Sequence, residues 1–176
     1  MKVRTAVLQD EQDIINIIAG AVKRMGEQGL DQWQKGYPSK EIIDEDIDEA
    51  LAMELKFDME LYEDKTVGYM SLMFTDLECY ENIDGSWADN GFYCSVHRLC
   101  VDGENLKAGI ASAMLAAAEL IAKEQGYLNM RIDTHKDNAA MRSVVEKNGY
   151  VHCGTIKLIG GEEDGAKREA YEKILK

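Results

Sequence analysis

The chain has 176 residues, of which 45% are hydrophobic and 30% charged, so it can bury one substantial core. This composition excludes a disordered or collagen-like chain. The formal net charge of −13 argues against nucleic acid or an anionic membrane as the main partner, because both are polyanions. We therefore expect a single domain over residues 1–176. Its acidic excess is local, since residues 41–90 carry sixteen acidic and two basic side chains.

The start of the chain shows no basic segment followed by an apolar run, so no secretory signal is predicted. The longest apolar-rich stretch, residues 110–122, is too short to span a bilayer. The four cysteines are dispersed, with no CxxC pair and no histidine at a metal-ligand spacing. These features predict a cytoplasmic protein with reduced cysteines and no bound metal.

The first half of the chain predicts a strand, two helices and a hairpin. Asp10 is a plausible N-cap, and the apolar residues after it recur at helical spacing. Ser39 likewise precedes an amphipathic segment. The predicted elements are a strand over residues 3–8, a helix over 10–27, a loop to Pro38, a helix from Ser39 to about Met53, and hairpin strands over 56–62 and 66–74.

The second half alternates strands and helices. Gly126 and Gly149 each follow a helical pattern, in the position typical of a left-handed cap. Helices between strands predict an α/β sheet flanked by helices. The predicted elements are a polar loop over residues 76–90, a β-rich run over 91–101, a helix over 108–125, a strand over 128–134, a helix over 138–148, and strands over 150–159 and 166–175.

The segment 99–115 combines a strand, a short loop and the start of a long helix. The first turn of a helix has about four unpaired N–H groups and a partial positive charge. Ala108, Gly109 and Ala111 are small there, which lets an anion approach the backbone, and Lys107 adds a charge. The pattern indicates a pyrophosphate cradle. The alternative is an ordinary strand–helix junction with small residues for packing.

This segment resembles the acyl-CoA-binding motif of the GNAT N-acetyltransferase superfamily, a Gln/Arg-x-x-Gly-x-Gly/Ala run between a strand and a helix. Here the run is Leu106-Lys107-Ala108-Gly109-Ile110-Ala111, with Leu106 in the place of the leading Gln or Arg. Residues 126–134 and 138–150 are similar to the next strand and helix of the family. The match extends from about Tyr93 to the C-terminus, and the earlier element order agrees.

The resemblance implies a mixed, mostly antiparallel sheet with a splayed central strand pair, flanked by about four helices. It also implies acetyl-CoA as cosubstrate, with the pantetheine arm lying along the splayed strand. By this resemblance the cofactor-binding residues are Leu99, Cys100 and Val101 for the arm, Lys107, Ala108, Gly109, Ile110 and Ala111 for the pyrophosphate, and Asn138. Asn138 is also well suited to capping the helix that follows it.

Acyl transfer from a thioester to an amine needs a neutral amine, a stabilised oxyanion and a proton for the thiolate. His97 is the candidate base, because period-two alternation places it on the strand face of Leu99 and Val101. The alternative is a structural histidine. His135, at a strand end, is either a second base or a loop residue.

Two positions bear on the rest of the mechanism. Val145 stands where many family members have a tyrosine that protonates the thiolate, so water is expected to supply that proton. Cys100 lies on a strand and is interpreted as a small core residue rather than as a nucleophile. Direct attack by the amine in a ternary complex is therefore expected.

The N-terminal half is expected to form the acceptor site, with Trp33, Tyr37 and Tyr69 as walls; packing of loop aromatics is the alternative. The resemblance implies a small-molecule or peptide amine as acceptor and a possible homodimer. The acidic block over residues 41–90 either frames a cationic amine or forms a solvated surface. The alternative function is a non-catalytic acyl-CoA-binding or interaction module of the same fold.

Overall fold

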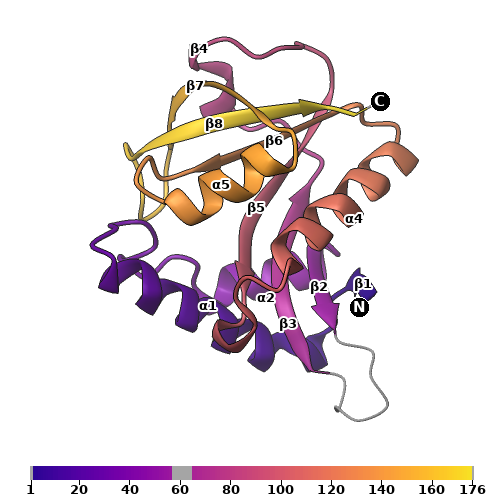
Figure 1. The fold of residues 1–176 in the computed structure, drawn as a ribbon, viewed down its shortest axis with the longest axis vertical. Helices are drawn as coiled ribbons and strands as arrows, with labels where there is room; N and C mark the ends of the chain where they lie inside the picture. The colour runs from indigo at the N-terminus through magenta and orange to yellow at the C-terminus, as the bar shows by residue number, and fades with distance from the viewer. Residues whose placement is uncertain (1, 57–64, 176) are drawn as a thin grey trace.

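The computed structural model describes residues 2–56 and 65–175, which form one eight-stranded sheet flanked by helices (Figure 1). The strands are β1 (Lys2–Thr5), β2 (Ala52–Lys56), β3 (Thr66–Met73), β4 (Asp84–Gly85), β5 (Tyr93–Val101), β6 (Asn129–Thr134), β7 (Val151–Lys157) and β8 (Lys167–Ile174). The helices are α1 (Glu11–Glu27), α2 (Lys40–Asp48), α3 (Glu78–Glu81), α4 (Ile110–Glu124) and α5 (Ala139–Lys147).

The strands lie in the order β1-β2-β3-β5-β6-β8-β7-β4. Every neighbouring pair is antiparallel except β5 and β6, which are parallel. The expected mixed, mostly antiparallel sheet is therefore confirmed, with the one-turn helix α3 added to four longer helices. Within the described ranges, no helix is long and apolar enough to cross a membrane.

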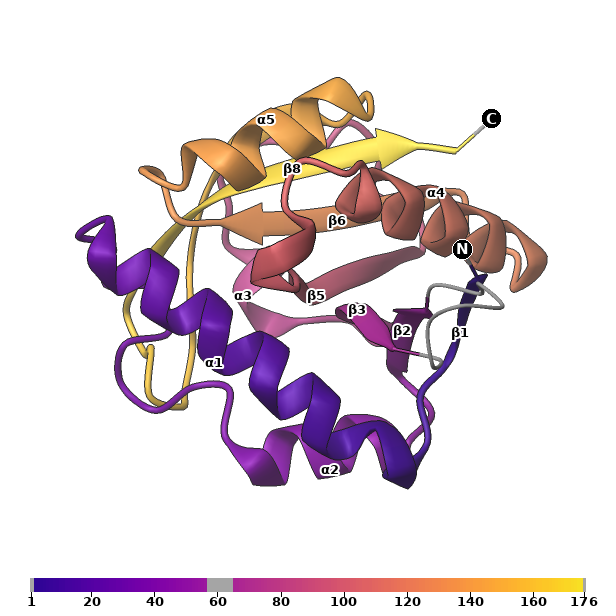
Figure 2. The same ribbon diagram turned by 60° about the horizontal axis from the view of Figure 1, so that its bottom comes forward.

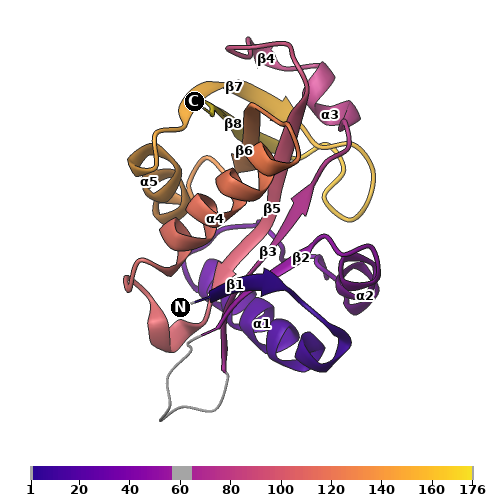
Figure 3. The same cartoon turned by 90° about the vertical axis from the view of Figure 1, so that its right-hand side faces the viewer.

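The helices cover both faces of the sheet. Figures 2 and 3 show α1 and α2 on one face and α4 and α5 on the other. Each face has its own apolar core. The α4-side core includes Met70, Leu72, Val96, Met114 and Ile132. The α1-side core includes Ile14, Ile18, Trp33, Ile43 and Tyr69.

The structure refines the predictions for the first strand and for the N-cap of α1. The strand predicted over residues 3–8 ends at Thr5, because the chain then makes a 3₁₀ turn. Asp10 stands at the N-cap position of α1, as predicted, but its side chain makes no capping hydrogen bond to the helix. Its buried carboxylate instead accepts a hydrogen bond from the Val7 N–H at 2.9 Å and pairs with Arg4 at 2.9 Å.

The second helix is shorter than predicted. It ends at Asp48 rather than near Met53, since Ala50 adopts a left-handed φ of 57° and turns the chain into β2. The first four residues of β2 are all buried, including Glu54, so burial does not alternate along the strand.

The hairpin and the polar loop were predicted in part. The predicted second strand over residues 66–74 matches β3, whereas most of the predicted first strand over 56–62 lies outside the described residues. The predicted loop over 76–90 contains α3 and β4. Tyr80 of α3 is buried and packs on the ring of Tyr93. From β5 onward each predicted element agrees with the structure to within two residues at either end.

The central strands β5 and β6 are splayed. Their pairing covers Tyr93 to Val96 only, and the last pair is Val96 with Ile132. β5 continues to Val101, still paired with β3 on its other edge, while β6 continues along β8. A gap therefore opens between the second half of β5 and the end of β6.

A β-bulge at Arg98 changes the alternation of β5. Arg98 has a φ of 56°, and the register with β3 shifts there. Before the bulge Val96 points into the α4-side core, and after it Leu99 and Val101 pack against that same core. His97 therefore faces the opposite side of the sheet, and the prediction that it shares a face with Leu99 and Val101 is wrong.

Candidate active site

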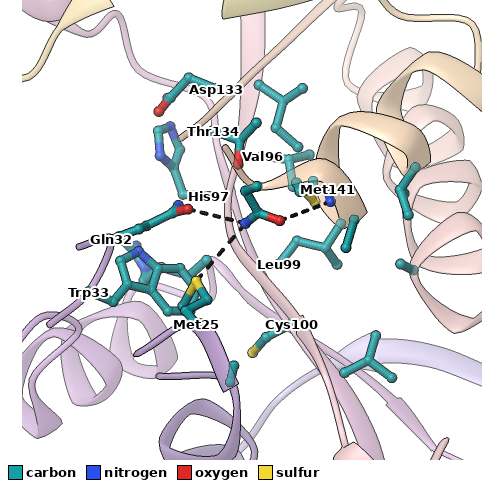
Figure 4. A pocket seen from close by; sticks show the side chains of 18 of the residues that line it. Met25, Gln32, Trp33, Val96, His97, Leu99, Cys100, Asp133, Thr134 and Met141 are labelled. Atoms are coloured by element: carbon teal, nitrogen blue, oxygen red, sulfur yellow. Dashed lines mark hydrogen bonds between the residues drawn. The ribbon is translucent and has the colours of Figure 1, made fainter. Parts of the chain in front are cut away.

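A cavity of about 1040 Å³ extends along the gap between β5 and β6 (Figure 4). At one end it is lined by the first turn of α4, and in the middle by Leu99 and Thr134. At the other end it is lined by Trp33 and Tyr37 from the α1–α2 loop and by the β7–β8 loop. This volume is at the upper end of the range for ligand sites, so it suits one long ligand and a smaller second one.

The first turn of α4 has the open backbone that the predicted pyrophosphate cradle requires. The Ala113 N–H donates to the Gly109 carbonyl at 3.0 Å, so the amide groups before Ala113 precede the first intrahelical bond. Gly109 adopts a left-handed φ of 80°, and a Cβ added to it would meet nothing within 4 Å. Lys107 is also left-handed, with a φ of 64°. Open space in front of free amides fits a pyrophosphate group.

Three cations surround this end of the cavity. Arg24 of α1, Lys107 of the cradle loop and Lys147 of α5 all line it. α5 is tied to the first turns of α4 because the Asn148 side-chain amide donates to the Ser112 hydroxyl at 2.9 Å. Arg24 and Lys147 were not predicted from the sequence, because they lie on helices far from the cradle motif.

Backbone pairing decides which groups of β5 face the gap. The Asp102 N–H donates to the Val67 carbonyl at 2.9 Å. In an antiparallel ladder bonding alternates, so the backbone of Cys100 points toward β3, while the groups of Leu99 and Val101 point into the gap. Cys100 lines the cavity but does not offer its backbone to it.

One of the β5 backbone groups that face the gap already has a hydrogen-bond partner. The Val101 carbonyl accepts a hydrogen bond from Arg24 Nη2 at 2.8 Å. The amide and carbonyl of Leu99 and the Val101 amide remain to face a ligand in the gap. These groups are placed to pair with an extended ligand as an added strand would.

Asn138 caps α5, which is one of the two roles predicted for it. Its Oδ1 accepts a hydrogen bond from the Met141 N–H at 3.0 Å, and its Nδ2 donates to Gln32 Oε1 at 3.2 Å. In Figure 4 dashed lines mark the bond to Gln32 of the α1–α2 loop and the bond from Met141 of α5. Asn138 lines the cavity, so its side chain lies beside the predicted path of the cofactor arm.

His97 lines the cavity at the end formed by Trp33 and Tyr37, which we call the acceptor end after the sequence-based prediction. Its Nε2 lies 3.1 Å from Ser95 Oγ, and its ring stacks on Tyr80 with centroids 6.3 Å apart. Burial, and then the positive charge of Arg98, lower the pKa of His97 to about 3. The imidazole is therefore neutral near pH 7, and it holds a proton only weakly.

Asp133 lies beside His97 and was missed from the sequence (Figure 4). It lines the cavity, and the Tyr80 hydroxyl donates a hydrogen bond to its Oδ1 at 2.8 Å. Burial raises the pKa of its carboxyl. Alternation along β6 would have identified it, because its neighbours Met130 and Ile132 are apolar and point to the other face.

A buried network supports the acceptor end. Arg98 Nε donates to Asp46 at 2.8 Å, and Arg98 Nη1 donates to the Tyr37 hydroxyl at 2.8 Å. Tyr69 was predicted to be a wall of the acceptor site, but it does not line the cavity. It is fully buried beneath it, and its hydroxyl donates to Asp46. Trp33 does line the cavity, and its backbone N–H donates to Glu163 Oε1 of the β7–β8 loop at 2.8 Å.

Residues 24–150 match the family model described as the acetyltransferase (GNAT) family, and this range spans both the cradle and the splayed strands. The chain belongs to this family. A comparison with curated protein sequences found no match.

Solved structures of similar fold agree with this GNAT assignment. A GNAT-family acetyltransferase from Streptococcus agalactiae is 28% identical, with a TM-score of 0.86 over 99% of this chain and 95% of that one. A PaiA N-acetyltransferase from Thermoplasma acidophilum, in complex with coenzyme A, is 18% identical, with a TM-score of 0.67 over 98% of each chain. A ribosomal-protein-alanine N-acetyltransferase from Brucella melitensis is 19% identical, with a TM-score of 0.69 over 99% of this chain and 100% of that one.

As a GNAT protein, the chain is an acyltransferase that uses a CoA-derived cosubstrate. Of the predicted cofactor residues, all but Ala108 line the cavity. The Ala108 N–H is turned inward instead, where it donates to the Asn105 carbonyl at 3.4 Å. Val145 is fully buried in the α4-side core, so no hydroxyl reaches the cavity from that position. Within the described ranges no cluster of His, Cys, Asp and Glu side chains is placed to hold a metal ion.

Proposed function

We propose that this protein transfers an acetyl group from acetyl-CoA to a primary amine by direct attack in a ternary complex, with residues 1–176 acting as one domain. The observation that carries the proposal is the continuous cavity. It joins the α4 cradle on one side of the sheet to the aromatic wall of Trp33 and Tyr37 on the other. Two substrates entering from opposite ends would meet at the gap between β5 and β6.

The donor side follows from the free backbone groups. We assign the pyrophosphate to the amides of Gly109, Ile110 and Ala111 with the charge of Lys107, and the pantetheine arm to Leu99 and Val101 with Asn138 beside it. The oxyanion of the tetrahedral intermediate would accept hydrogen bonds from the β5 amides that face the gap. These assignments rest on open space, unpaired amides and local positive charge, all at one end of the cavity.

Two side chains bear on the route of transfer. Burial raises the pKa of the Cys100 thiol to about 12, which suppresses the thiolate needed for a covalent acyl-enzyme and favours direct attack. His97, with a pKa of about 3, binds a proton too weakly to be the favoured base. We therefore assign His97 a hydrogen-bonding role beside the acceptor.

An amine panel tests the proposal. Wild-type protein is mixed with acetyl-CoA and, one at a time, polyamines, amino acids, aminoglycosides and short peptides, and released thiol is measured. At least one amine is expected to give thiol release together with an acetylated product seen by mass spectrometry. Acetyl-CoA binding without thiol release from any amine would contradict the proposed enzyme.

A non-catalytic acyl-CoA-binding module is the second candidate. It is favoured by one observation, the buried Val145 where a proton-donating tyrosine is common in the family. The same panel separates the two functions, because a binding module shows an acetyl-CoA-dependent rise in melting temperature but no turnover. The cytoplasmic location and the homodimer expected from the sequence stay predictions.

A further inference from the structure

The carboxylate of Asp133 lies at the point where the sheet opens. Ile132 and Val96 form the last pair between β6 and β5, so Asp133 stands one residue beyond it, at the mouth of the gap. Ile132 points into the α4-side core. By strand alternation Asp133 points to the opposite face, the one that Trp33 and Tyr37 cover.

This carboxylate has one hydrogen-bond donor and no cation of its own. Only the Tyr80 hydroxyl donates to it among the described residues, and none of their cations lies within ion-pair distance of it. Arg168, which is close enough to act on it electrostatically, is paired with Glu163 at 2.8 Å. The titratable groups that face it are Tyr80 and Cys79 of α3, His97 of β5, Tyr37 of the α1–α2 loop, Glu163 of the β7–β8 loop and Arg168 of β8.

A partly buried carboxylate without a cation is costly, and a cationic ligand offsets that cost. Arg168 and Glu163 are paired with each other and act on Asp133 in opposite senses, and the guanidinium of Arg98 is paired with Asp46, so neither guanidinium forms an ion pair with Asp133. The acceptor end of the cavity therefore favours a compact positive charge placed against Asp133.

We propose that Asp133 binds the acceptor as an alkylammonium ion and takes the proton that frees the nitrogen lone pair. This inference rests on the proposed acetyl transfer and deepens it. It names the acceptor class as alkyl primary amines that are protonated at neutral pH. It also moves the role of base from His97 to a side chain on the neighbouring strand.

The proton transfers balance along this route. The ammonium N–H bond breaks and its proton goes to an Asp133 oxygen. The free amine attacks the thioester carbonyl, forming the C–N bond, and collapse of the tetrahedral intermediate breaks the C–S bond. The second proton lost by the nitrogen goes to the departing thiolate directly or through water, and Asp133 returns its proton to solvent.

The pKa values of the two candidate bases, Asp133 and His97, are shifted in opposite directions. Burial raises the pKa of the Asp133 carboxyl, which makes it a better proton acceptor, while His97 has its pKa lowered to about 3. The bond from Tyr80 moderates the effect, since a donor to the carboxylate lowers the pKa of Asp133. Removing the Tyr80 hydroxyl should therefore raise that pKa further.

The test uses Asp133→Asn with an active amine from the panel. Asp133→Asn keeps the size of the side chain, and we expect kcat/KM for the amine to fall about 100-fold or more, as for loss of a general base. Acetyl-CoA affinity by calorimetry should stay at the wild-type value, which also shows that the variant folds. Asp137→Asn, at an exposed position three residues from the end of β6, is the matched control and should behave like wild type.

Tyr80→Phe separates a base from a structural carboxylate. If Asp133 is the base, the acidic limb of the kcat/KM–pH profile moves to higher pH in Tyr80→Phe and disappears in Asp133→Asn. An Asp133→Asn variant within about threefold of wild-type kcat/KM, or an acidic limb that Tyr80→Phe leaves in place, overturns the inference while acetyl transfer stands. Absence of thiol release from wild-type protein with every amine overturns both.

Discussion

At the scale of single residues, one backbone conformation decides the chemistry around the gap. Arg98 sits at a φ of 56°, which L-residues rarely adopt, and its buried guanidinium is held there by Asp46. The bulge turns Leu99 and Val101 toward the cofactor side and leaves His97 facing the acceptor side. Sequence alternation alone gives the wrong face for His97, because no glycine or asparagine in β5 signals a left-handed residue.

The neutral state of His97 has a consequence for stability. The folded protein lowers the pKa of His97 from 6.5 to about 3, so between these values the unfolded chain binds a proton that the folded chain does not. The contribution of His97 to stability is therefore present above pH 6.5 and is lost as the pH falls toward 3.

We expect His97→Gln to weaken the acid dependence of unfolding. One proton corresponds to a limiting slope of about 1.4 kcal/mol per pH unit, reduced here because the side chain is partly open to the cavity. Urea unfolding measured from neutral pH downward should show wild-type stability falling more steeply than that of His97→Gln. Parallel curves for the two proteins would mean that His97 titrates alike in both states.

At the scale of elements, the C-terminal half was predictable because each helix carries its own stop. Gly126 and Gly149 both adopt a φ of 84° at the ends of α4 and α5, and Asn138 caps α5. The N-terminal half lacked such signals around β2. The first four residues of that strand are buried on both faces of the sheet, and no glycine or proline separates it from α2.

The cradle at the start of α4 can be tested against the end of the same helix. Gly109 and Gly126 have φ values of 80° and 84°, and a Cβ on either would meet nothing within 4 Å. Glutamate at either position thus costs a similar backbone strain, roughly 1–2 kcal/mol. Only Gly109→Glu places a negative charge and bulk in front of the α4 amides.

Calorimetry with acetyl-CoA should therefore separate the two variants. We expect Gly109→Glu to show no detectable binding and Gly126→Glu to bind with wild-type affinity, at comparable melting temperatures without ligand. Equal affinities in both variants would remove the pyrophosphate from the α4 cradle.

At the scale of the whole molecule, the charge distribution differs from the simplest interpretation of the sequence. Of the described residues in the acidic block over 41–90, only Ile42 and Cys79 line the cavity, and neither is acidic. The carboxylates of the described residues that line the cavity are Asp133, Glu162 and Glu163, all outside the block, whereas Asp46 of the block is buried and paired with Arg98. The structure thus favours the solvated-surface alternative for the block, because net charge along a sequence does not specify which face a side chain occupies.

The family, the sheet and the cradle could be predicted because they depend on local spacing within residues 93–150. The acceptor side could not, since it brings together α1, α3, β6 and the β7–β8 loop, which are distant in the sequence. The Trp33–Glu163 hydrogen bond, for example, joins residues 130 positions apart. Only the fold places such groups around one cavity.

The central claim is that both substrates meet in this cavity and react directly. Its most direct test is the initial rate of thiol release, measured while the concentrations of acetyl-CoA and an active amine are both varied. We expect double-reciprocal lines that intersect, because a ternary complex must form before the acetyl group moves. Parallel lines, together with an acetylated protein isolated in the absence of amine, would show a covalent intermediate and contradict this account.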